Sequence, residues 1–374
     1  MSSILIISFS PIHSDPRVMR QVRLLERLHR ITVVGYGRPP EADIEFLPVY
    51  KPRASLWLKA FWAALLLLGA FERYYRGLPQ VIQADRMLAG RKFDLVIAND
   101  ISALPLALEV AGGRPVLMDA HEYSPREFDD RLLWKVLFGR YHDALCRRYL
   151  HRAMAMTTVC EGIALEYERV YGVPCKVIHN APLDQKLAPS AVGGNCIRLI
   201  HHGSAIRSRH LEVMIEMMKH LDERFTLDFM LVETDAAYMA ELRVKAQPCE
   251  RVRFIEPVAM QDICRRLNGF DVGVYLLPPV NFNHQHALPN KFFEFIQARL
   301  AVAIGPSPEM AALVRRYECG VIAESFDAGA LADTIRKLDR QTVERLKTAS
   351  DRAARELNYE QGGQLLLSEV ERLL

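Results

Sequence analysis

The chain has 374 residues and a formal net charge of +3; half of its residues are hydrophobic and a quarter are charged. This composition excludes a disordered chain, and the near-neutral charge without an RNA- or DNA-binding motif argues against nucleic-acid binding. The length favours two domains. The seven cysteines are scattered and form no C-x-x-C pair, which argues against disulfides, zinc and iron–sulfur clusters and favours a reducing compartment.

The first residues are typical of a β-strand rather than of a signal peptide. Residues 1–3 carry no basic side chain, residues 4–7 are Ile-Leu-Ile-Ile, and no small-residue cleavage site follows. We therefore expect a cytoplasmic protein. Its charge is unevenly divided, because residues 1–182 hold 24 Lys and Arg against 19 Asp and Glu, whereas the remaining residues hold 24 against 26.

Short β-branched or aliphatic runs alternate with helical patterns along the chain. This order is the βαβ rhythm of a parallel sheet. The first set of runs lies at residues 4–8, 31–36, 95–98, 115–119, 155–159 and 175–179. A second set lies at residues 197–201, 227–232, 252–255, 272–276, 301–304 and 320–323.

Between the two sets, residues 181–195 contain two prolines, two glycines and little periodicity, as is typical of a linker. We therefore predict an α/β protein with two doubly wound, Rossmann-like domains, residues 1–182 and 183–355, followed by a helix in residues 356–374. Because ligands bind outside the carboxyl ends of parallel strands, two such sheets facing each other imply a cleft with one substrate in each half. The expected chemistry is transfer between two bound molecules.

The turn after the first strand of the second domain carries two arginines. Arg207 and Arg209 follow a strand end and a small-residue turn that contains Gly203 and Ser204. Cations at this place would stabilise the charge that builds on a departing diphosphate. The alternative is that both arginines are solvated residues at a helix start, although cations there oppose the helix dipole and so favour an anionic ligand.

A helix start near Leu288 carries the most informative pattern in the sequence. Pro289 is tolerated in a first helical turn, and apolar residues follow Asn290 at helical spacing. Free N–H groups at a helix start bind a diphosphate, and Lys291 in the first turn requires an anionic partner. Glu294 lies one turn along, where its carboxylate could hydrogen-bond a ribose. An ordinary amphipathic helix with a proline start is the alternative.

Several further motifs stand in a characteristic order. They are Ser-Asp-Pro-Arg-Val at residues 14–18, Asp-Ala-His-Glu at 119–122, Thr-Val-Cys at 158–160, Val-Ile-His-Asn at 177–180, His-Gly-Ser at 202–204 and Leu-Pro-Asn-Lys-x-x-Glu at 288–294. Together they resemble the retaining glycosyltransferases of family 4, which have the GT-B fold. The resemblance spans nearly the whole chain. It implies that a sugar moves, with retention, from a nucleotide sugar in the second domain to an acceptor in the first, without a metal ion or other cofactor.

The resemblance also implies roles for single residues of the first domain. His121 would lie by the donor sugar, and Glu122 could orient it. A lone histidine near a strand end is equally typical of a packing residue. Asp15, Arg17 and Glu122 would lie on the acceptor side, and the C-terminal helix would cross back to this domain.

In the second domain, the resemblance implies that Glu294 binds the ribose and that residues 288–291 hold the diphosphate. Two positions depart from the family pattern. Ser204 stands where the family commonly has arginine, and His286 stands where it has a glutamate, eight residues before Glu294. His286 could still donate to sugar hydroxyls. These departures leave open a degenerate GT-B protein that binds a nucleotide sugar without transferring it. A sugar-nucleotide epimerase built on the same two-domain plan is a further alternative.

Two stretches of the basic half, residues 56–76 and 131–152, combine apolar and basic side chains. The first contains a run of twelve uncharged residues, 60–71, which is too short to span a bilayer core that needs about 20 apolar residues. Both stretches are amphipathic enough to dock on anionic lipid, and the alternative is that both pack on the sheet as core helices. If these stretches dock on lipid, we expect a lipid-linked acceptor and a peripheral position on the inner face of the cell membrane.

We therefore expect a metal-independent, retaining glycosyltransferase of cell-envelope glycan assembly, such as polysaccharide, lipopolysaccharide or glycolipid biosynthesis. Its expected partners are a nucleotide-sugar donor and a glycan or lipid-linked acceptor.

Overall fold

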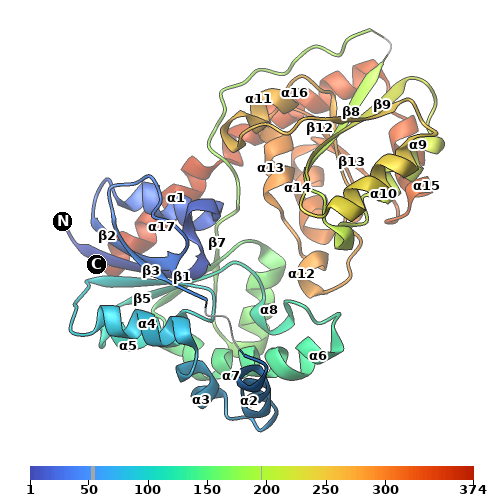
Figure 1. Cartoon of the computed structure of the whole chain (residues 1–374). Coiled ribbons are helices and arrows are strands. Elements are labelled where there is room, and N and C mark those ends of the chain that lie inside the picture. Colours follow the sequence, from blue (N-terminus) through green and yellow to red (C-terminus); the bar gives the residue numbers. More distant parts are fainter. Residues whose placement is uncertain (52–54, 195) are drawn as a thin grey trace. The chain divides into compact units, whose positions relative to one another are not determined.

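The computed structural model describes residues 1–51, 55–194 and 196–374. Internal contacts divide the chain into two compact units (Figure 1). Unit 1 comprises residues 1–178, 281–283 and 362–374, and unit 2 comprises residues 179–280 and 284–361. The predicted domain boundaries after residues 182 and 355 remain predictions, because a division by contacts does not test which segments fold on their own.

Unit 1 is built on a sheet of seven parallel strands in the order β3-β2-β1-β4-β5-β6-β7. Residues 4–7 of the central strand β1 are fully buried, as expected for a parallel strand covered on both faces. The strands are β1 (Ser3–Pro11), β2 (Arg30–Tyr36), β3 (Glu45–Val49), β4 (Leu95–Asn99), β5 (Val116–Ala120), β6 (Ala155–Thr158) and β7 (Lys176–Val177).

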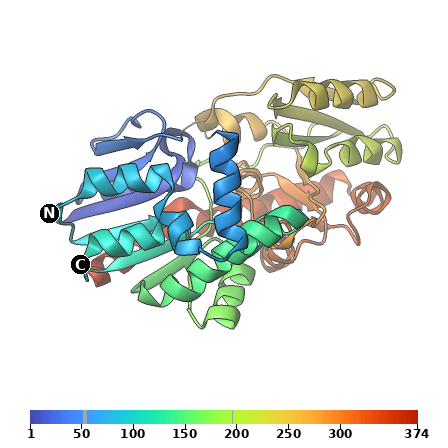
Figure 2. The ribbon, with the colours of Figure 1, turned by 60° about the horizontal axis from the view of Figure 1, so that its bottom comes forward.

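Helices cover both faces of this sheet. Figure 2 shows α4 and α5 over one face, while apolar side chains of α1 and α17 pack with Ile4 and Ile6. An ion pair between Lys176 and Glu369 joins β7 to α17. The helices are α1 (Pro16–Leu25), α2 (Leu56–Leu67), α3 (Phe71–Arg76), α4 (Pro79–Leu88), α5 (Leu104–Ala111), α6 (Leu132–Trp134), α7 (Arg140–Tyr149), α8 (Glu161–Tyr171) and, from residue 362 on, α17 (Tyr359–Leu373), with the short helical turns η1 (Ile12–Ser14), η2 (Ser124–Arg126), η3 (Lys135–Gly139) and η4 (Leu150–Arg152).

Unit 2 contains a second parallel sheet, of six strands, in the order β10-β9-β8-β11-β12-β13. Its strands are β8 (Ile197–Ser204), β9 (Phe225–Val232), β10 (Val252–Ile255), β11 (Val272–Tyr275), β12 (Ala301–Ile304) and β13 (Gly320–Ile322). Its helices are α9 (Glu212–Lys219), α10 (Ala236–Ala246), α11 (Ile263–Leu267), α13 (Asn290–Gln297), α14 (Pro308–Tyr317), α15 (Ala328–Arg336) and α16 (Arg340–Glu356), with the turns η5 (Arg207–Arg209) and η6 (Met260–Asp262). The short helix α12 (Phe282–Gln285) has its first two residues in unit 1 and its last two in unit 2. Two doubly wound parallel sheets confirm the predicted α/β fold class.

Close packing fixes α13 on the sheet of unit 2. A Cβ atom at Gly273 in β11 would lie 2.3 Å from the ring of Phe295, so the absence of a side chain lets α13 lie directly against the strand. The helix begins at Asn290, and Pro289 precedes it as the N-cap residue with ψ of 156°. The helix predicted to start near Leu288 is therefore present but begins two residues later, and Pro289 is its N-cap rather than a residue of its first turn, because the backbone of Pro289 is still extended.

Within the described part of the chain, every helix falls short of the length and apolarity that crossing a bilayer requires.

Candidate functional site

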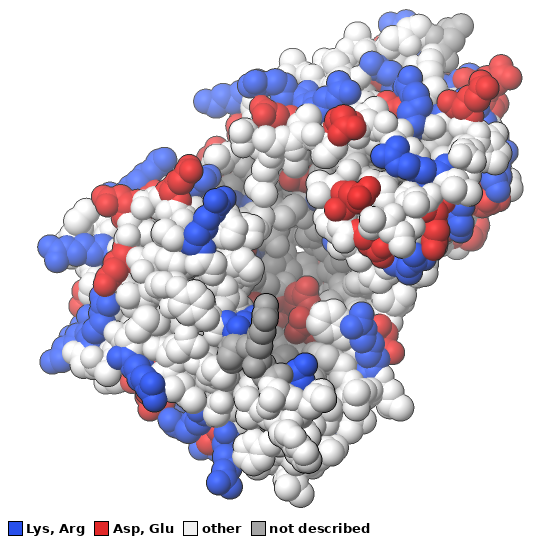
Figure 3. Space-filling view, in the orientation of Figure 1, with Lys and Arg blue, Asp and Glu red and all other residues white. Residues whose placement is uncertain are grey.

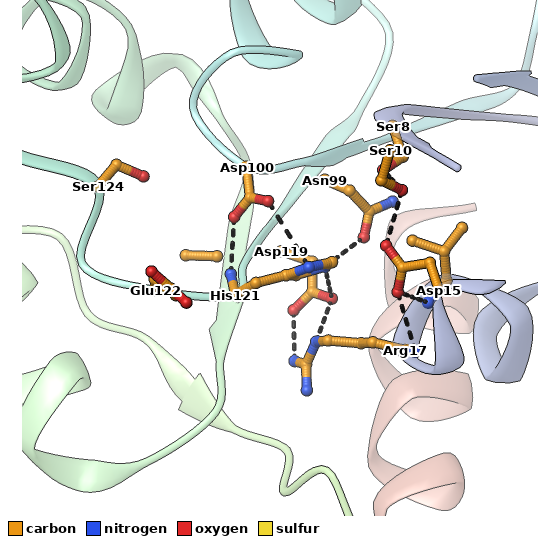
Figure 4. A network of polar contacts seen from close by, with 12 residues as sticks. Ser8, Ser10, Asp15, Arg17, Asn99, Asp100, Asp119, His121, Glu122 and Ser124 are labelled. Carbon is orange, nitrogen blue, oxygen red and sulfur yellow. Dashed lines mark hydrogen bonds and ion pairs between the residues drawn. The ribbon is translucent and has the colours of Figure 1, made fainter. Parts of the chain in front are cut away.

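Asp119, near the end of β5, anchors a buried polar network at the carboxyl edge of the unit 1 sheet (Figure 4). Arg17 of α1 donates to both carboxylate oxygens, from Nη2 at 2.6 Å and from Nε at 2.7 Å. Gln21 and Thr157 donate to the same carboxylate at 2.5 Å and 2.6 Å. Burial raises the pKa of Asp119, but the charges of Arg17 and His121 outweigh burial and hold the pKa well below its ordinary value. The carboxylate is therefore ionised.

Asp15 caps the helix that carries Arg17. Its carboxylate accepts hydrogen bonds from the backbone N–H groups of Arg17 and Val18, at 3.1 Å and 3.2 Å, and from the Ser10 hydroxyl at 2.7 Å. An acidic N-cap satisfies free N–H groups and complements the helix dipole. Asp15 and Arg17 thus hold the start of α1 against Asp119, and contact of either residue with an acceptor stays a prediction.

His121 follows β5 and is held by three polar side chains. Its Nε2 atom lies 3.0 Å from Asn99 Oδ1 and 3.6 Å from Asp119 Oδ2, and its Nδ1 atom lies 3.6 Å from Asp100 Oδ2. Its backbone N–H donates to Asp100 Oδ1 at 2.9 Å. Asp100 itself has φ of 64°, in the left-handed region that aspartate tolerates better than most residues.

The charge of His121 follows from these neighbours. Burial lowers the pKa of His121, but the carboxylates of Asp100 and Asp119 outweigh burial and raise the pKa to about 9. The imidazole ring is therefore a cation at neutral pH, with two N–H donors. Such a group can donate to a hydroxyl or to an anionic oxygen of a ligand.

The structure does not give Glu122 its predicted role of orienting His121. The Glu122 carboxylate accepts a hydrogen bond from Asn283 Nδ2 at 3.3 Å, and in Figure 4 it lies on the other side of the His121 main chain from the imidazole ring. Asn99 and Asp100 orient His121 instead. Sequence reasoning missed both, although they stand at the end of β4 beside β5, and the rule that ligand sites lie at carboxyl strand ends could have found them.

In unit 2, Lys291 lies in the first turn of α13 and is only 7% exposed. Its Nζ atom lies 3.4 Å from His201 Nε2 and 4.9 Å from the centroid of the Tyr275 ring. A Cβ atom at Gly203, in β8, would lie 2.8 Å from Lys291 Nζ and 3.9 Å from Arg209 Nη1. The missing side chain of Gly203 therefore leaves room for two cationic groups.

The pKa values of this cluster indicate that burial disfavours positive charge on Lys291 and on the two neighbouring imidazoles. Burial and the charge of Arg209 lower the pKa of Lys291, and Glu294 opposes them, which leaves it at about 7. Burial and Lys291 lower the pKa of His202 to about 3, and the same two causes hold the pKa of His201 well below its ordinary value. Both imidazoles are therefore neutral at pH 7, so an anionic ligand would stabilise Lys291 and Arg209.

The first turn of α13 combines this charge with backbone donors. The first N–H groups of a helix have no intrahelical partner, and Pro289 provides no side-chain cap here. Leu288 is buried, and Asn290 Oδ1 is buried without a hydrogen-bond partner among the described residues. Glu294 Oε2, one turn along, lies 3.3 Å from His202 Nε2. Residues 288–291 and Glu294 therefore meet in one cluster, and their contact with a donor stays a prediction.

The structure separates the two predicted arginines. Arg209 lies beside Gly203, whereas Arg207 pairs with Glu241 of α10 at 2.7 Å and 3.0 Å. The Arg207 guanidinium group also lies 4.8 Å from the centroid of the Tyr238 ring. Arg209 is thus the arginine that the structure brings to Lys291, while Ser204 ends β8 nearby as a half-buried residue.

His286 has a carboxylate partner that the sequence did not reveal. Its Nδ1 atom lies 2.9 Å from Glu309 Oε1, in the first turn of α14. Since β8, β11 and β12 are neighbouring parallel strands, the loops that carry His286 and Glu309 follow strands at the edge where Lys291 lies. Elsewhere, the part of the chain that the structure describes holds no group of three or more His, Cys, Asp or Glu arranged to bind a metal ion.

We predict that His121 titrates with a pKa of about 9. Asp100→Asn should lower this pKa towards about 6.5, because one carboxylate charge is lost. The asparagine Oδ1 atom can still accept the hydrogen bond from the His121 backbone N–H. Because the folded pKa is raised, the stability that the charge provides is complete below about pH 6.5 and is lost as the pH rises through about 9. NMR titration of the imidazole resonances measures both values. A wild-type pKa near 6.5 would contradict the prediction.

Residues 17–181 match the model of Glycosyltransferase Family 4. Comparison with curated proteins finds no match. Among solved structures, HepE of Anabaena in complex with UDP and glucose is similar at 15% identity and a TM-score of 0.72, with 100% of both chains covered. Sucrose-phosphate synthase from Thermosynechococcus elongatus is similar at 14% identity and a TM-score of 0.74, with 100% of this chain and 99% of that chain covered.

WaaG, a glycosyltransferase involved in lipopolysaccharide biosynthesis, is similar at 13% identity and a TM-score of 0.66, with 97% of this chain and 98% of that chain covered. Identities this low establish the fold alone. The chain therefore has the GT-B fold, and its residues 17–181 match Glycosyltransferase Family 4.

Proposed function

We propose that the protein is a glycosyltransferase that moves a sugar from a nucleotide-sugar donor, bound by unit 2, to an acceptor bound by unit 1. The observation that carries this proposal is the buried Lys291, with Arg209 beside it, at the uncapped start of α13. The family match and the HepE structures, which contain UDP and UDP-glucose, support it.

Each part of a nucleoside diphosphate has a chemical partner in this cluster. Diphosphate oxygens would accept hydrogen bonds from the first N–H groups of α13 and from Lys291 and Arg209. The carboxylate of Glu294 would accept from ribose hydroxyls. His286 and Glu309, together a donor and an acceptor, would hydrogen-bond the donor sugar.

The reaction needs charge stabilisation more than covalent chemistry from the protein. As the bond between sugar and phosphate breaks, negative charge builds on the departing diphosphate, and fixed cations lower the barrier. Lys291 and Arg209 supply that charge, so we propose that the reaction requires no metal ion or other cofactor. The cationic His121 would donate to a sugar oxygen near the reacting centre. Retention of configuration is part of the proposal and is supported by the resemblance to family 4.

We further propose a cytoplasmic enzyme of cell-envelope glycan assembly that acts on a lipid-linked acceptor at the inner face of the membrane. Exposed large apolar side chains on two helices of unit 1 support this placement. They are Leu56, Trp57 and Phe61 on α2 and Leu132 and Leu133 on α6, and Trp57 is 87% exposed. α2 lies beside η3, which continues α6 (Figure 2).

Basic side chains are also exposed in the segments that carry these apolar residues. Figure 3 shows a largely uncharged surface at the lower end of unit 1, with cations at its borders. Exposed large apolar side chains rimmed by lysine and arginine are suited to an anionic bilayer surface rather than to a sheet core. The exposed basic residues of these segments are Lys59, Arg73, Arg76, Arg131, Lys135, Arg140, Arg147, Arg148 and Arg152.

We predict that Trp57→Ala combined with Leu133→Ala lowers binding to vesicles that contain anionic phospholipid by at least about tenfold, because each large apolar side chain gains about 1.5–3 kcal/mol on leaving water. Co-sedimentation measures the binding. Leu165→Ala, which removes an exposed leucine of α8, is the matched control. Equal binding of the double variant and the wild type would contradict the docking proposal.

We predict that Glu294→Gln weakens the binding of nucleoside diphosphates roughly 10–100-fold, since a hydrogen bond to a charged group contributes about 1.5–3 kcal/mol. Inorganic pyrophosphate has no ribose, so its binding should not change. Thermal stabilisation by UDP, GDP, ADP and pyrophosphate, in buffer with a chelator, measures the difference. Glu250→Gln, at an exposed position of unit 2, is the control.

Two results would contradict this assignment of Glu294: unchanged stabilisation by the nucleoside diphosphate, or a matching loss with pyrophosphate. Activity assays then distinguish the classes of protein. Slow hydrolysis of one sugar nucleotide supports a transferase. Interconversion of sugar nucleotides without an acceptor would indicate an epimerase, and the absence of both reactions would indicate a binding protein.

A further inference from the structure

Three residues of the segment between β11 and α13 pack with unit 1. Contacts assign residues 281–283 to unit 1, although Val280 and His284 on either side belong to unit 2. We call residues 281–283 the tether. The start of α13, with Asn290 and Lys291, lies only seven residues beyond Asn283 along the chain.

Asn283 makes the central contact of the tether. Its Oδ1 atom accepts from the backbone N–H of Tyr123 at 2.9 Å, and its Nδ2 atom donates to the backbone carbonyl of Tyr123 at 3.3 Å. The same Nδ2 atom donates to Glu122 Oε2 at 3.3 Å. A side-chain amide is suited to this place because it carries both a donor and an acceptor, and so it pairs both backbone groups of one residue. Asn283 is buried, which makes these bonds costly to lose.

The other two residues of the tether bind the same loop. The ring of Phe282 is buried, with its centroid 5.1 Å from that of Tyr123, and the guanidinium group of Arg126 lies 4.7 Å from the Phe282 ring. Asn281 Nδ2 lies 3.3 Å from the carbonyl oxygen of Glu127 and 3.2 Å from Asp130 Oδ1. The tether therefore spans the loop of residues 122–130, which begins directly after His121.

The opposite side of this loop is fixed by α8. The hydroxyl of Tyr167 accepts from the backbone N–H of Ser124 at 3.1 Å and donates to the carbonyl oxygen of Glu122 at 3.0 Å. The Tyr123 and Tyr167 rings pack edge to face with their centroids 4.8 Å apart. The backbone around Tyr123 is thus held from two sides within unit 1, by Tyr167 of α8 and by the Asn283 amide of the tether.

We propose that Asn283 is a positioning residue that couples the ordering of the His121 loop to the occupation of the diphosphate site at α13. Seven residues span at most about 25 Å, so a change in the start of α13 is passed to Asn283 through a short segment. A diphosphate bound by Lys291 and the first N–H groups would restrict that segment and stabilise the pairing of Asn283 with Tyr123. The inference rests on the proposed function, since it takes the nucleotide site at α13 as given.

The test compares full-length wild type with Asn283→Ala and with Asn268→Ala. Asn268 is the matched control, because its amide also donates to two backbone carbonyls, those of Ala188 and Ala298, both in unit 2. Hydrogen–deuterium exchange of residues 121–130 is measured with and without whichever of UDP, GDP and ADP stabilises the wild type most. The rate of donor hydrolysis without acceptor is measured with the corresponding sugar nucleotide.

We expect the nucleotide to slow exchange in residues 121–130 of the wild type and of Asn268→Ala but not of Asn283→Ala. Asn283→Ala should bind the nucleotide within about threefold of the wild type and lose at least about tenfold in kcat, with KM little changed, because the donor site itself is intact. Unchanged kcat and unchanged protection in Asn283→Ala, with nucleotide binding intact, would overturn the coupling. An equal loss of kcat in Asn268→Ala would also overturn it. Failure of all three nucleotides to stabilise the wild type would instead overturn the proposed function.

Discussion

The ammonium group of Lys291 is buried beside neutral groups and another cation, and the donor half of the proposed mechanism depends on this arrangement. Its nearest partners are the imidazole of His201 and the aromatic face of Tyr275, and the charge of Arg209 opposes its protonation. Removing a charge from water is costly unless an opposite charge compensates it. Gly203 makes this burial possible, because it has no side chain and Lys291 can therefore reach the end of β8. A bound diphosphate would supply the missing negative charge, which is why we regard the cluster as a ligand site.

In unit 1, by contrast, the buried charged group is a carboxylate with several hydrogen-bond donors around it. Asp119 is buried with a complete set of donors, and Asp100 and Asp119 hold His121 as a cation. Unit 1 therefore surrounds its buried carboxylate with donors and holds His121 as a cation, while unit 2 brings Lys291 and Arg209 together with Glu294 as an opposing charge. Each cluster lies at the carboxyl ends of parallel strands, where open α/β sheets bind ligands.

Strand runs and helical periodicity are local properties of a sequence. They were therefore sufficient to predict the two sheets and to place Lys291 and Glu294 on one helix. Strand β3 escaped prediction since Pro48 interrupts it, and proline is tolerated there only because β3 is an edge strand. The pairing of His286 with Glu309, and of Arg207 with Glu241, joins residues far apart in the sequence. Such contacts depend on strand order and helix packing, which periodicity in a single sequence does not report. The contact of Asn283 with Tyr123 was missed for the same reason.

Calorimetry of nucleoside diphosphate binding at about pH 8.5, in buffers of different ionisation enthalpy, tests the central claim most directly. Free Lys291, with a pKa of about 7, is mostly neutral at that pH, and a bound diphosphate would raise its pKa. Binding of UDP, GDP or ADP should then take up nearly one proton, and Lys291→Met should abolish the uptake and most of the affinity. No binding of any of the three, or proton uptake that persists in Lys291→Met, would contradict the account.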